Sequence, residues 1–305
     1  MIEVHARPYD LAMSTTVELK VANYLMAIEG LAMIRNVSAG PSAIEPRANE
    51  IAMIVRSVDQ PPLSTMIDII RHDVSTGYSM WAPRYDGPNP AIEAEEPVFA
   101  ELVRASPSGI ALDAACGTGR HSAILSAMGW NVIGVDATDA MLERARAKVP
   151  DATFHQGRMQ ALPVDSDSVD LVVCGLALSH VEDLAPVYAE FERVLKPGGR
   201  VITTDMHPTM CSTGGMAAFP VTDKRPDVAA GDPMTINYVP NLVHNVNEYV
   251  AAIVGARLEI VGCHEPLVGE STVASFPSFE AFPDATRSAF VGLPYLLIWD
   301  LAKRT

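Results

Sequence analysis

The fold of this chain is decided by the stretch LDAACGTGR, residues 112–120. The apolar segment 109–112 predicts a short buried strand, and a helix is expected to follow over 120–128. Between them, Gly117 and Gly119 lack the Cβ atoms that would keep a ligand away from the backbone. A strand, a Gly-x-Gly turn and a helix in this order are typical of the edge of a parallel sheet where nucleotides bind.

A second feature lies at the end of the next predicted strand, 131–135, where Asp136 follows the apolar residues. A carboxylate at this position can accept hydrogen bonds from both ribose hydroxyls of an adenosine group. The alternative role, capping of the following helix, suits Asp139 better. The glycine turn and Asp136 together therefore predict a cofactor that contains adenosine.

The details of the turn argue against a dinucleotide. The dinucleotide fingerprint requires a third glycine, and Ser122 occupies that position. In addition, Asp113 lies at the end of the first strand, where its charge would repel a pyrophosphate but is compatible with an ammonium or a sulfonium. The pattern therefore favours an adenosine cofactor without a pyrophosphate.

Three segments resemble the class I S-adenosylmethionine-dependent methyltransferases: DAACGTGR at 113–120, VIGVD at 132–136 and LKPGGR at 195–200. The nearest kind is the small-molecule branch typified by enzymes of ubiquinone, menaquinone and biotin biosynthesis. The resemblance covers 110–206, extends to 244–305 only in the order of elements, and does not include 1–80. It implies an α/β, Rossmann-like sheet of strand order 3-2-1-4-5-7-6 with an antiparallel last strand. The residues outside the resemblance add an N-terminal helical extension and an insertion after strand five.

The resemblance also implies which residues bind S-adenosylmethionine. It places the methionine part at the glycine turn, the ribose at Asp136, the adenine between the loops after strands two and three, and the sulfonium beside the end of strand four. The cofactor-binding residues implied in this way are Tyr85, Asp113, Ala115, Gly117, Gly119, Asp136, Ala137, Met141, Arg158, Met159 and Cys174. Two of them depart from the family pattern. Ala115 stands where many members have glycine, and Arg158 replaces the usual acidic partner of the adenine amino group, to which arginine offers no acceptor.

Tyr78, Trp81 and Tyr85 lie in the segment that leads into the predicted domain. In the family an aromatic residue of this segment often lies over the cofactor. Alternatively, the three rings could pin the linker to the domain. Both interpretations stay open at this point.

Candidate catalytic residues are histidines near the ends of strands four and five, because that edge of the sheet faces the ligand. Methyl transfer is an in-line displacement, so a base is needed only if the acceptor must lose a proton. We predict His207 or His180 as that base, with His207 slightly favoured because Pro208 restricts its backbone. Asp205 could orient His207 or could cap the strand end, and His244 is a weaker candidate for the base.

The chain is predicted to contain a helical extension or lid at 1–90 and a cofactor-binding domain at 91–305, with an insertion at 208–240. Helices are expected at 11–36 and 63–73, with another around the apolar segment 51–58. The extension and the insertion are expected to cover the acceptor. Alternatively, their apolar surface could form the interface of a homodimer.

Composition excludes several classes of partner. Lys and Arg number 22 against 37 Asp and Glu, a net charge of −15, which argues against nucleic acid as a partner. Charged residues interrupt the apolar stretch 11–34, so we predict neither a signal peptide nor a membrane span. The four cysteines form no CxxC pair, so no metal site and no disulfide framework are expected, and a cytoplasmic location is predicted.

These features predict an enzyme that uses S-adenosylmethionine to methylate a small, partly apolar metabolite. The alternative is a protein of the same fold that binds the cofactor but catalyses a cyclisation or rearrangement without net methyl transfer. The residues quoted for the cofactor do not separate the two.

Overall fold

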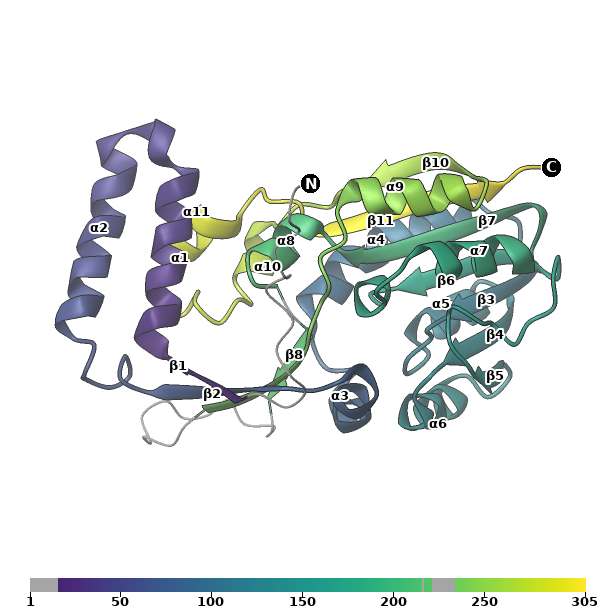
Figure 1. Ribbon diagram of the computed structural model, residues 1–305, viewed down its shortest axis with the longest axis horizontal. Helices are drawn as coiled ribbons and strands as arrows, with labels where there is room; N and C mark the ends of the chain where they lie inside the picture. Colours follow the sequence, from purple (N-terminus) through teal and green to yellow (C-terminus); the bar gives the residue numbers. More distant parts are fainter. Residues whose placement is uncertain (1–15, 216, 221–233) are drawn as a thin grey trace, which may run out of the picture. The chain divides into compact units, whose positions relative to one another are not determined.

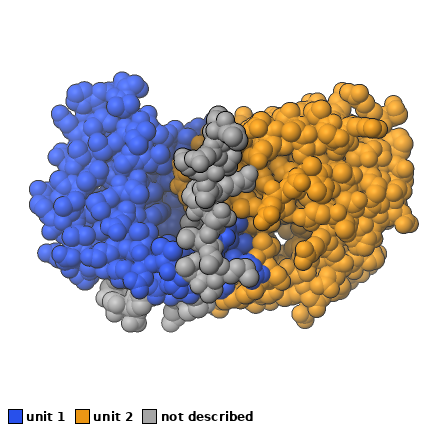
Figure 2. All heavy atoms as spheres, viewed as in Figure 1, with its two compact units in different colours: residues 1–73, 216–240, 267–293 blue, residues 74–215, 241–266, 294–305 orange. Residues whose placement is uncertain are grey.

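The computed structural model describes residues 16–215, 217–220 and 234–305. The chain divides into two compact units (Figure 2). Unit 1 comprises residues 1–73, 216–240 and 267–293, and unit 2 comprises residues 74–215, 241–266 and 294–305. Among the helices of the described ranges, none is both long enough and apolar enough to cross a bilayer.

Unit 2 is built on a seven-stranded sheet of order β10-β11-β7-β6-β3-β4-β5 (Figure 1). The strands are β3 Ile110–Ala114, β4 Asn131–Asp136, β5 Thr153–Gln156, β6 Val169–Gly175, β7 Leu195–Met206, β10 Leu258–His264 and β11 Leu296–Lys303. All neighbours pair in parallel except β11, which is antiparallel to both β7 and β10. Numbered along the chain within this sheet, the order is 3-2-1-4-5-7-6 with an antiparallel last strand, so the predicted topology is confirmed.

The helices of unit 2 alternate with the parallel strands, as predicted from the sequence. They are α3 Val74–Trp81, α4 Pro90–Arg104, α5 Arg120–Ala127, α6 Asp139–Lys148, α7 Ala185–Val194, α8 Pro208–Ser212 and α9 Val246–Gly255, with short 3-10 turns η2 Ala82–Arg84 and η3 Leu178–His180. The central strand β6 is apolar at nearly every position and is buried along most of its length. This pattern is expected of a strand with helices on both faces of the sheet.

Unit 1 contains a smaller, four-stranded sheet of order β1-β2-β9-β8. Its strands are β1 Thr16–Lys20, β2 Met66–Arg71, β8 Ala217–Pro220 and β9 Met234–Val239, and its helices are α1 Val21–Arg35, α2 Pro41–Arg56, α10 Glu270–Val273 and α11 Pro283–Phe290, with the 3-10 turn η1 Val37–Ala39. The helix predicted over 63–73 is wrong, because 66–71 forms β2. Three isoleucines favour the extended conformation there, and the parallel partner β9 is remote in the sequence.

The predicted helix over 11–36 also needs correction. Residues 16–20 form β1, paired antiparallel with β2, and the helix begins only at Val21. Positions 11–15 lie outside the described residues, as do 216 and 221–233 of the predicted insertion. The remainder of that insertion contributes α8, β8 and β9, so regular structure exists where the sequence showed no clear period.

Helices α1 and α2 of unit 1 enclose a group of charged side chains. The Glu29 side chain is 0% exposed, and its Oε2 lies 3.6 Å from Nε of Arg47, whose Nη2 contacts Glu50 at 3.0 Å. Burial raises the pKa of Glu29 from 4.5 to about 8, helped by the neighbouring carboxylate of Glu50 and opposed by the charge of Arg47. Glu29 therefore holds a proton in the folded unit at neutral pH.

We expect this proton to make unit 1 less stable as pH rises. The folded state keeps the Glu29 proton up to pH about 8, whereas the unfolded chain loses it near its ordinary pKa of 4.5. Unfolding therefore releases a proton between these values, and stability falls across that window. Melting temperatures at pH 5 to 9 should drop less steeply for Glu29→Gln than for the wild type. Glu45→Gln, the same change at an exposed position of α2, should follow the wild-type curve.

Candidate functional site

The glycine turn between β3 and α5 has the backbone conformation that a close ligand requires. Ala115, Gly117 and Gly119 have φ of 61°, 52° and 82°, in the left-handed region. A Cβ on Gly119 would lie 3.1 Å from the backbone of Ala145, so this position tolerates only glycine. A Cβ on Gly117 would meet only the Tyr85 ring, at 4.0 Å. Ala115 adopts the left-handed conformation with its Cβ in place and packs against the core of unit 2. The open space beside Gly117 suits the predicted cofactor.

Asp136 joins this turn to the end of β4. Its Oδ2 accepts a hydrogen bond from the Gly117 N–H and its Oδ1 from the Thr138 N–H, both at 2.8 Å. Burial raises the pKa of Asp136, and the two backbone hydrogen bonds partly offset that effect. Each carboxylate oxygen retains a second lone pair. Asp136 can thus accept ribose hydroxyls while it holds the glycine turn, which agrees with its predicted role.

Asp113 has a different environment. Its side chain is buried, and its Oδ2 accepts a hydrogen bond of 2.6 Å from the hydroxyl of Ser122 on α5. Burial raises the pKa of Asp113, while the charge of His121 and the Ser122 hydrogen bond lower it in part. The carboxylate therefore ties the start of α5 to the end of β3, and its contact with the methionine part stays a prediction.

A buried charged group beneath the turn was missed by the sequence analysis. Glu95 of α4 is fully buried and contacts Arg120, His121 and Thr204. Burial alone would raise the pKa of Glu95, but the charges of His121 and Arg120 and the hydrogen bonds outweigh it and lower the pKa to about 2. One signal was available. Glu95 lies on the buried face of α4 together with Ala91, Phe99 and Val103. A single charged residue on an apolar helix face predicts a buried ion pair or hydrogen bond.

The residues predicted around the adenine and the sulfonium differ in their exposure to solvent. Ala137 and Arg158 are exposed, Met141 is buried in α6, and Met159 packs on the core of the unit. Arg158 lies in a tight turn bridged to Ala161. Cys174, at the end of β6, is buried with its Sγ 3.4 Å from Sδ of Met159. Burial raises the pKa of the Cys174 thiol well above its ordinary value, so this thiol stays neutral.

An aromatic cluster formed by Tyr78, Trp81 and Tyr85 reaches from the glycine turn to η3. The ring of Tyr78 lies 5.8 Å from Trp81 and 6.0 Å from Tyr85, and Trp81 and Tyr85 meet edge to face at 5.0 Å. At one end, Tyr85 lies beside Gly117. At the other end, the Tyr78 hydroxyl is 2.6 Å from Nε2 of His180. The cluster therefore connects a predicted cofactor loop with a predicted catalytic histidine.

The segment that carries the cluster is fastened to the glycine turn. Oδ1 of Asp86, which follows Tyr85, accepts hydrogen bonds from the Thr118 hydroxyl at 2.6 Å and from Lys148 at 2.7 Å. Burial opposes ionisation of Asp86, but its bonds to Lys148 and Thr118 prevail and lower its pKa. Asp86 therefore fastens the linker to the glycine turn, while the position of an aromatic ring over the cofactor stays a prediction.

The other two histidines hold backbone groups. Nδ1 of His207 accepts from the Thr209 N–H at 3.1 Å, which caps α8, and its Nε2 lies 2.9 Å from Oε1 of Glu265. His244 is buried and donates from Nε2 to the carbonyl of Val181 at 2.8 Å. Both ring nitrogens of His207 are thus engaged, and a proton on Nδ1 would break the cap. These contacts support a structural role for His207 more than the base predicted from the sequence.

Asp205 does not orient His207. Its two oxygens accept from the backbone N–H groups of Ser179, at 2.6 Å, and Met206, at 2.7 Å. Ser179 belongs to η3, the turn that ends at His180. Burial raises the pKa of Asp205 to about 6, against the effect of these hydrogen bonds. Asp205 therefore anchors the turn that positions His180, and the alternative of a strand-end cap is the one that the structure supports.

We expect His207→Ala to affect stability more than chemistry. Loss of a helix cap typically costs about 0.5–2 kcal/mol, and α8 begins at the residue after His207. The melting temperature should fall by a few degrees, while the rate of methyl transfer in a single turnover stays within about threefold of wild type. His207→Asn, which retains a capping side chain, should recover most of the stability. A rate loss of about 10²-fold or more in both variants would restore His207 as the base.

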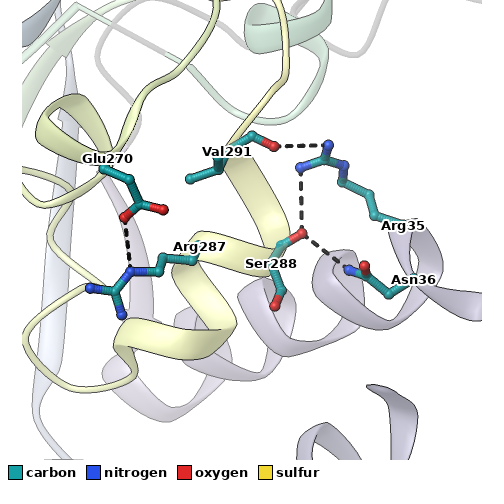
Figure 3. Close-up of a pocket in the computed structure, with 6 residues that line it drawn as sticks. All are labelled: Arg35, Asn36, Glu270, Arg287, Ser288 and Val291. Atoms are coloured by element: carbon teal, nitrogen blue, oxygen red, sulfur yellow. Dashed lines mark hydrogen bonds and ion pairs between the residues drawn. The ribbon is translucent and has the colours of Figure 1, made fainter. Parts of the chain in front are cut away.

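A pocket of about 340 Å³ lies in unit 1, lined by Arg35, Asn36, Glu270, Arg287, Ser288 and Val291 (Figure 3). Arg35 donates to the backbone carbonyls of Ala289 at 2.8 Å and Val291 at 3.1 Å, at the end of α11. Arg287 is turned toward Glu270, with Nε 3.0 Å from its carboxylate (Figure 3). Both guanidinium groups are thus engaged in fastening α11, and we assign no ligand to this pocket. Among the described residues, no cluster of His, Cys, Asp and Glu is suited to hold a metal ion.

Comparison with known proteins agrees with this geometry. Residues 112–203 match the family described as a methyltransferase domain. The demethylmenaquinone methyltransferase of Lactococcus lactis subsp. lactis is 41% identical over 108 residues, 32% of this chain and 43% of that protein. The demethylmenaquinone methyltransferase of Renibacterium salmoninarum is 31% identical over 143 residues, 45% of this chain and 60% of that protein. The chain therefore spans about half the length of these relatives.

A solved structure extends the similarity of fold. The geranyl diphosphate C-methyltransferase from Streptomyces coelicolor A3(2) superimposes with a TM-score of 0.50 at 18% identity, covering 69% of this chain and 79% of that one. This similarity of fold agrees with the strand order of the seven-stranded sheet of unit 2. Residues 112–203 are therefore similar to a methyltransferase domain, and unit 2 has the strand order of the class I S-adenosylmethionine-dependent methyltransferase fold.

Proposed function

We propose that this protein is an S-adenosylmethionine-dependent methyltransferase that acts on a small, partly apolar metabolite. The observation that carries the proposal is the contact of Asp136 with Gly117, which unites the two predicted cofactor segments at one edge of the sheet. Two further observations support it. Gly117 has open space at its Cβ position, and Tyr85 lies beside it.

The residues of unit 2 would divide the work of binding and positioning. Asp136 would hold the ribose, and Met141, Met159 and Ala137 would lie near the adenine. When bound, the cofactor supplies an electrophilic methyl group on a sulfonium. The aromatic cluster would exclude water and orient the acceptor, because transfer in line with the carbon–sulfur bond depends on alignment. His180, held by the turn that Asp205 anchors, would accept a proton from an acidic acceptor.

The names of two relatives support a proposal for the chemical class of the acceptor. The two relatives described above are named demethylmenaquinone methyltransferases. We therefore propose a reduced quinone ring, or a phenol of similar size, as the acceptor. Such rings are flat and apolar and carry an acidic hydroxyl, so they suit a site with tyrosine and tryptophan rings and one histidine.

A transfer experiment tests this function. The purified protein is incubated with S-adenosylmethionine labelled on the methyl carbon, together with 1,4-dihydroxynaphthalene or a cell extract. Label in an extractable product, with S-adenosylhomocysteine formed in equal amount, supports methyl transfer. Tight binding of S-adenosylhomocysteine without any transfer of label would instead support the cyclisation or rearrangement alternative.

We also propose that the N-terminal region at 1–90 and the insertion at 208–240 act as the acceptor-selecting part of the protein. The chain connectivity supports this role. Unit 2 gives way to unit 1 after β7 and after β10, and these strands end at the same edge of the sheet as β3 and β4. Deletion of residues 1–73 should abolish transfer and leave the affinity for S-adenosylhomocysteine within about threefold. Full transfer by the deleted protein would contradict this role.

The cellular setting is proposed from composition. We propose a reducing cytoplasm, since Cys116, Cys174 and Cys211 are buried free thiols and Cys263 is an exposed free thiol. A homodimer through apolar surface of the N-terminal region is proposed as an alternative use of that surface. Light scattering after size-exclusion chromatography gives the mass and decides between monomer and dimer.

A further inference from the structure

The hydroxyl of Tyr78 and the imidazole of His180 form a pair at the edge of the sheet that carries the predicted cofactor site. Oη of Tyr78 and Nε2 of His180 are 2.6 Å apart, and their rings meet edge to face at 5.2 Å. The two residues are 102 positions apart in the sequence, so the pair exists only through the fold. This distance lies within the range of hydrogen bonds donated by a hydroxyl group.

The pair is held rigidly on both sides. Tyr78 packs on Trp81 and Tyr85, and Tyr85 lies beside Gly117 of the glycine turn. His180 ends η3, whose Ser179 N–H donates to the buried Asp205. A row of groups thus runs from Gly117 to His180, across the loops that follow the neighbouring strands β3 and β6. The point between two such loops is where this class of sheet binds its ligands.

The surroundings keep the phenol neutral. Burial raises the pKa of Tyr78 well above its ordinary value, and Tyr85, Asp205 and Asp136 raise it further. A phenolate is therefore not the resting state, and Tyr78 by itself is a poor base. A neutral hydroxyl can, however, accept one proton while it donates another.

We propose that Tyr78 is a catalytic residue that relays the proton of the acceptor to His180. This inference rests on the proposed methyl transfer. It adds a residue that the sequence offered only as an aromatic contact. The acceptor class is one with an acidic hydroxyl that can reach Oη of Tyr78.

The O–H bond of the acceptor breaks and its proton passes to Oη of Tyr78, whose own proton moves to Nε2 of His180. The electron pair left on the acceptor would form the new bond to the methyl carbon, and the electron pair of the broken carbon–sulfur bond would remain on sulfur. The imidazolium of His180 then returns its proton to solvent through the same hydroxyl. Tyr78 is neutral before and after the step.

Two substitutions isolate the relay. Tyr78→Phe removes the hydroxyl and keeps the ring that packs on Trp81 and Tyr85. His180→Gln keeps an acceptor for the hydroxyl but cannot take a proton at neutral pH. Tyr188→Phe is the matched control, since it removes another buried hydroxyl of unit 2, bonded to Thr203 at 3.1 Å.

Three measurements are made on the full chain. Calorimetry with S-adenosylhomocysteine should give dissociation constants within about threefold of wild type for all variants. Single-turnover transfer to 1,4-dihydroxynaphthalene should fall about 10²-fold or more in Tyr78→Phe and in His180→Gln, with little further loss in the double variant, because the two act as one unit. The wild-type rate should rise with pH, because only a neutral His180 can accept the relayed proton. This rise should vanish in both variants and persist in Tyr188→Phe. Asp136, Asp205 and Tyr85 also face the pair and are unchanged in every variant.

A further measurement tests the pair independently of methyl transfer. Nitrogen-15 NMR of labelled histidine in the cofactor-free protein should show that neutral His180 carries no proton on Nε2, and Tyr78→Phe should shift that resonance. A neutral His180 with its proton on Nε2, or transfer by Tyr78→Phe at the wild-type rate and pH profile, would overturn the relay and leave the proposed function standing. Binding of S-adenosylhomocysteine by the wild type without transfer to the probe or to an extract would overturn both.

Discussion

Replacement of His180 by glutamine is expected to slow methyl transfer in a single turnover by about 10²–10⁴-fold. The reason is the loss of a positioned proton acceptor, since Nε2 of His180 lies 2.6 Å from the Tyr78 hydroxyl and its turn is anchored by Asp205. Single-turnover measurements with saturating cofactor separate this step from binding and product release.

The control for this result is a histidine of the same unit without a role in the site. His155→Gln changes an exposed residue of β5 and should leave the rate within about twofold. Equal rates for wild type and His180→Gln would exclude His180 as the base. If the His207 variants also kept the wild-type rate, catalysis by proximity and orientation alone would be the better description.

Replacement of Asp136 by alanine is expected to raise the dissociation constant for S-adenosylhomocysteine by roughly 30- to 150-fold. A carboxylate that accepts hydroxyl hydrogen bonds contributes about 2–3 kcal/mol, and each 1.4 kcal/mol is about tenfold in affinity. The structure adds a second cause. The same carboxylate accepts from the N–H groups of Gly117 and Thr138, so the glycine turn loses its tie to β4.

Calorimetry measures this loss, and thermal melting shows how much of it comes from a loosened turn. Asp136→Asn keeps one acceptor oxygen and should fall between wild type and Asp136→Ala. Asp139→Ala is the matched control, because this exposed aspartate lies in the first turn of α6 and was the residue expected to act as a simple cap. An unchanged dissociation constant in Asp136→Ala would contradict the assigned role.

Much of unit 2 was predictable because its signals are local. A short apolar strand, a Gly-x-Gly turn and a helix predict a cofactor loop without knowledge of any distant residue. The pairing of Asp136 with Gly117 was also within reach, since both follow neighbouring parallel strands whose carboxyl ends meet at one edge. The strand order of the sheet came from the resemblance, and the structure confirms it.

The contacts of His180 and His207 could not be predicted from the neighbouring sequence. His180 and His207 looked alike in the sequence, as each follows a predicted strand that faces the ligand. Their roles differ because of contacts from remote segments. Glu265 engages His207 from 58 positions away, whereas Tyr78 engages His180 from 102 positions away. The residue pattern of the strands before His180 and His207 contains no information about Tyr78 or Glu265.

The sequence by itself determined the position of the glycine turn between a strand and a helix, the alternation of strands and helices in unit 2 and the position of Asp136 at the end of a strand. The tertiary structure alone decided the Tyr78–His180 pair, the buried Glu95 network and the sheet of unit 1, in which β2 pairs with β9. The physical reason is that the sequence patterns depend on neighbouring residues, whereas these contacts depend on residues far apart in the chain. Apolar periodicity and glycine in a turn reflect the burial and backbone freedom of one short segment, whereas a hydrogen bond or a strand pair depends on which distant segment the fold brings within about 3 Å.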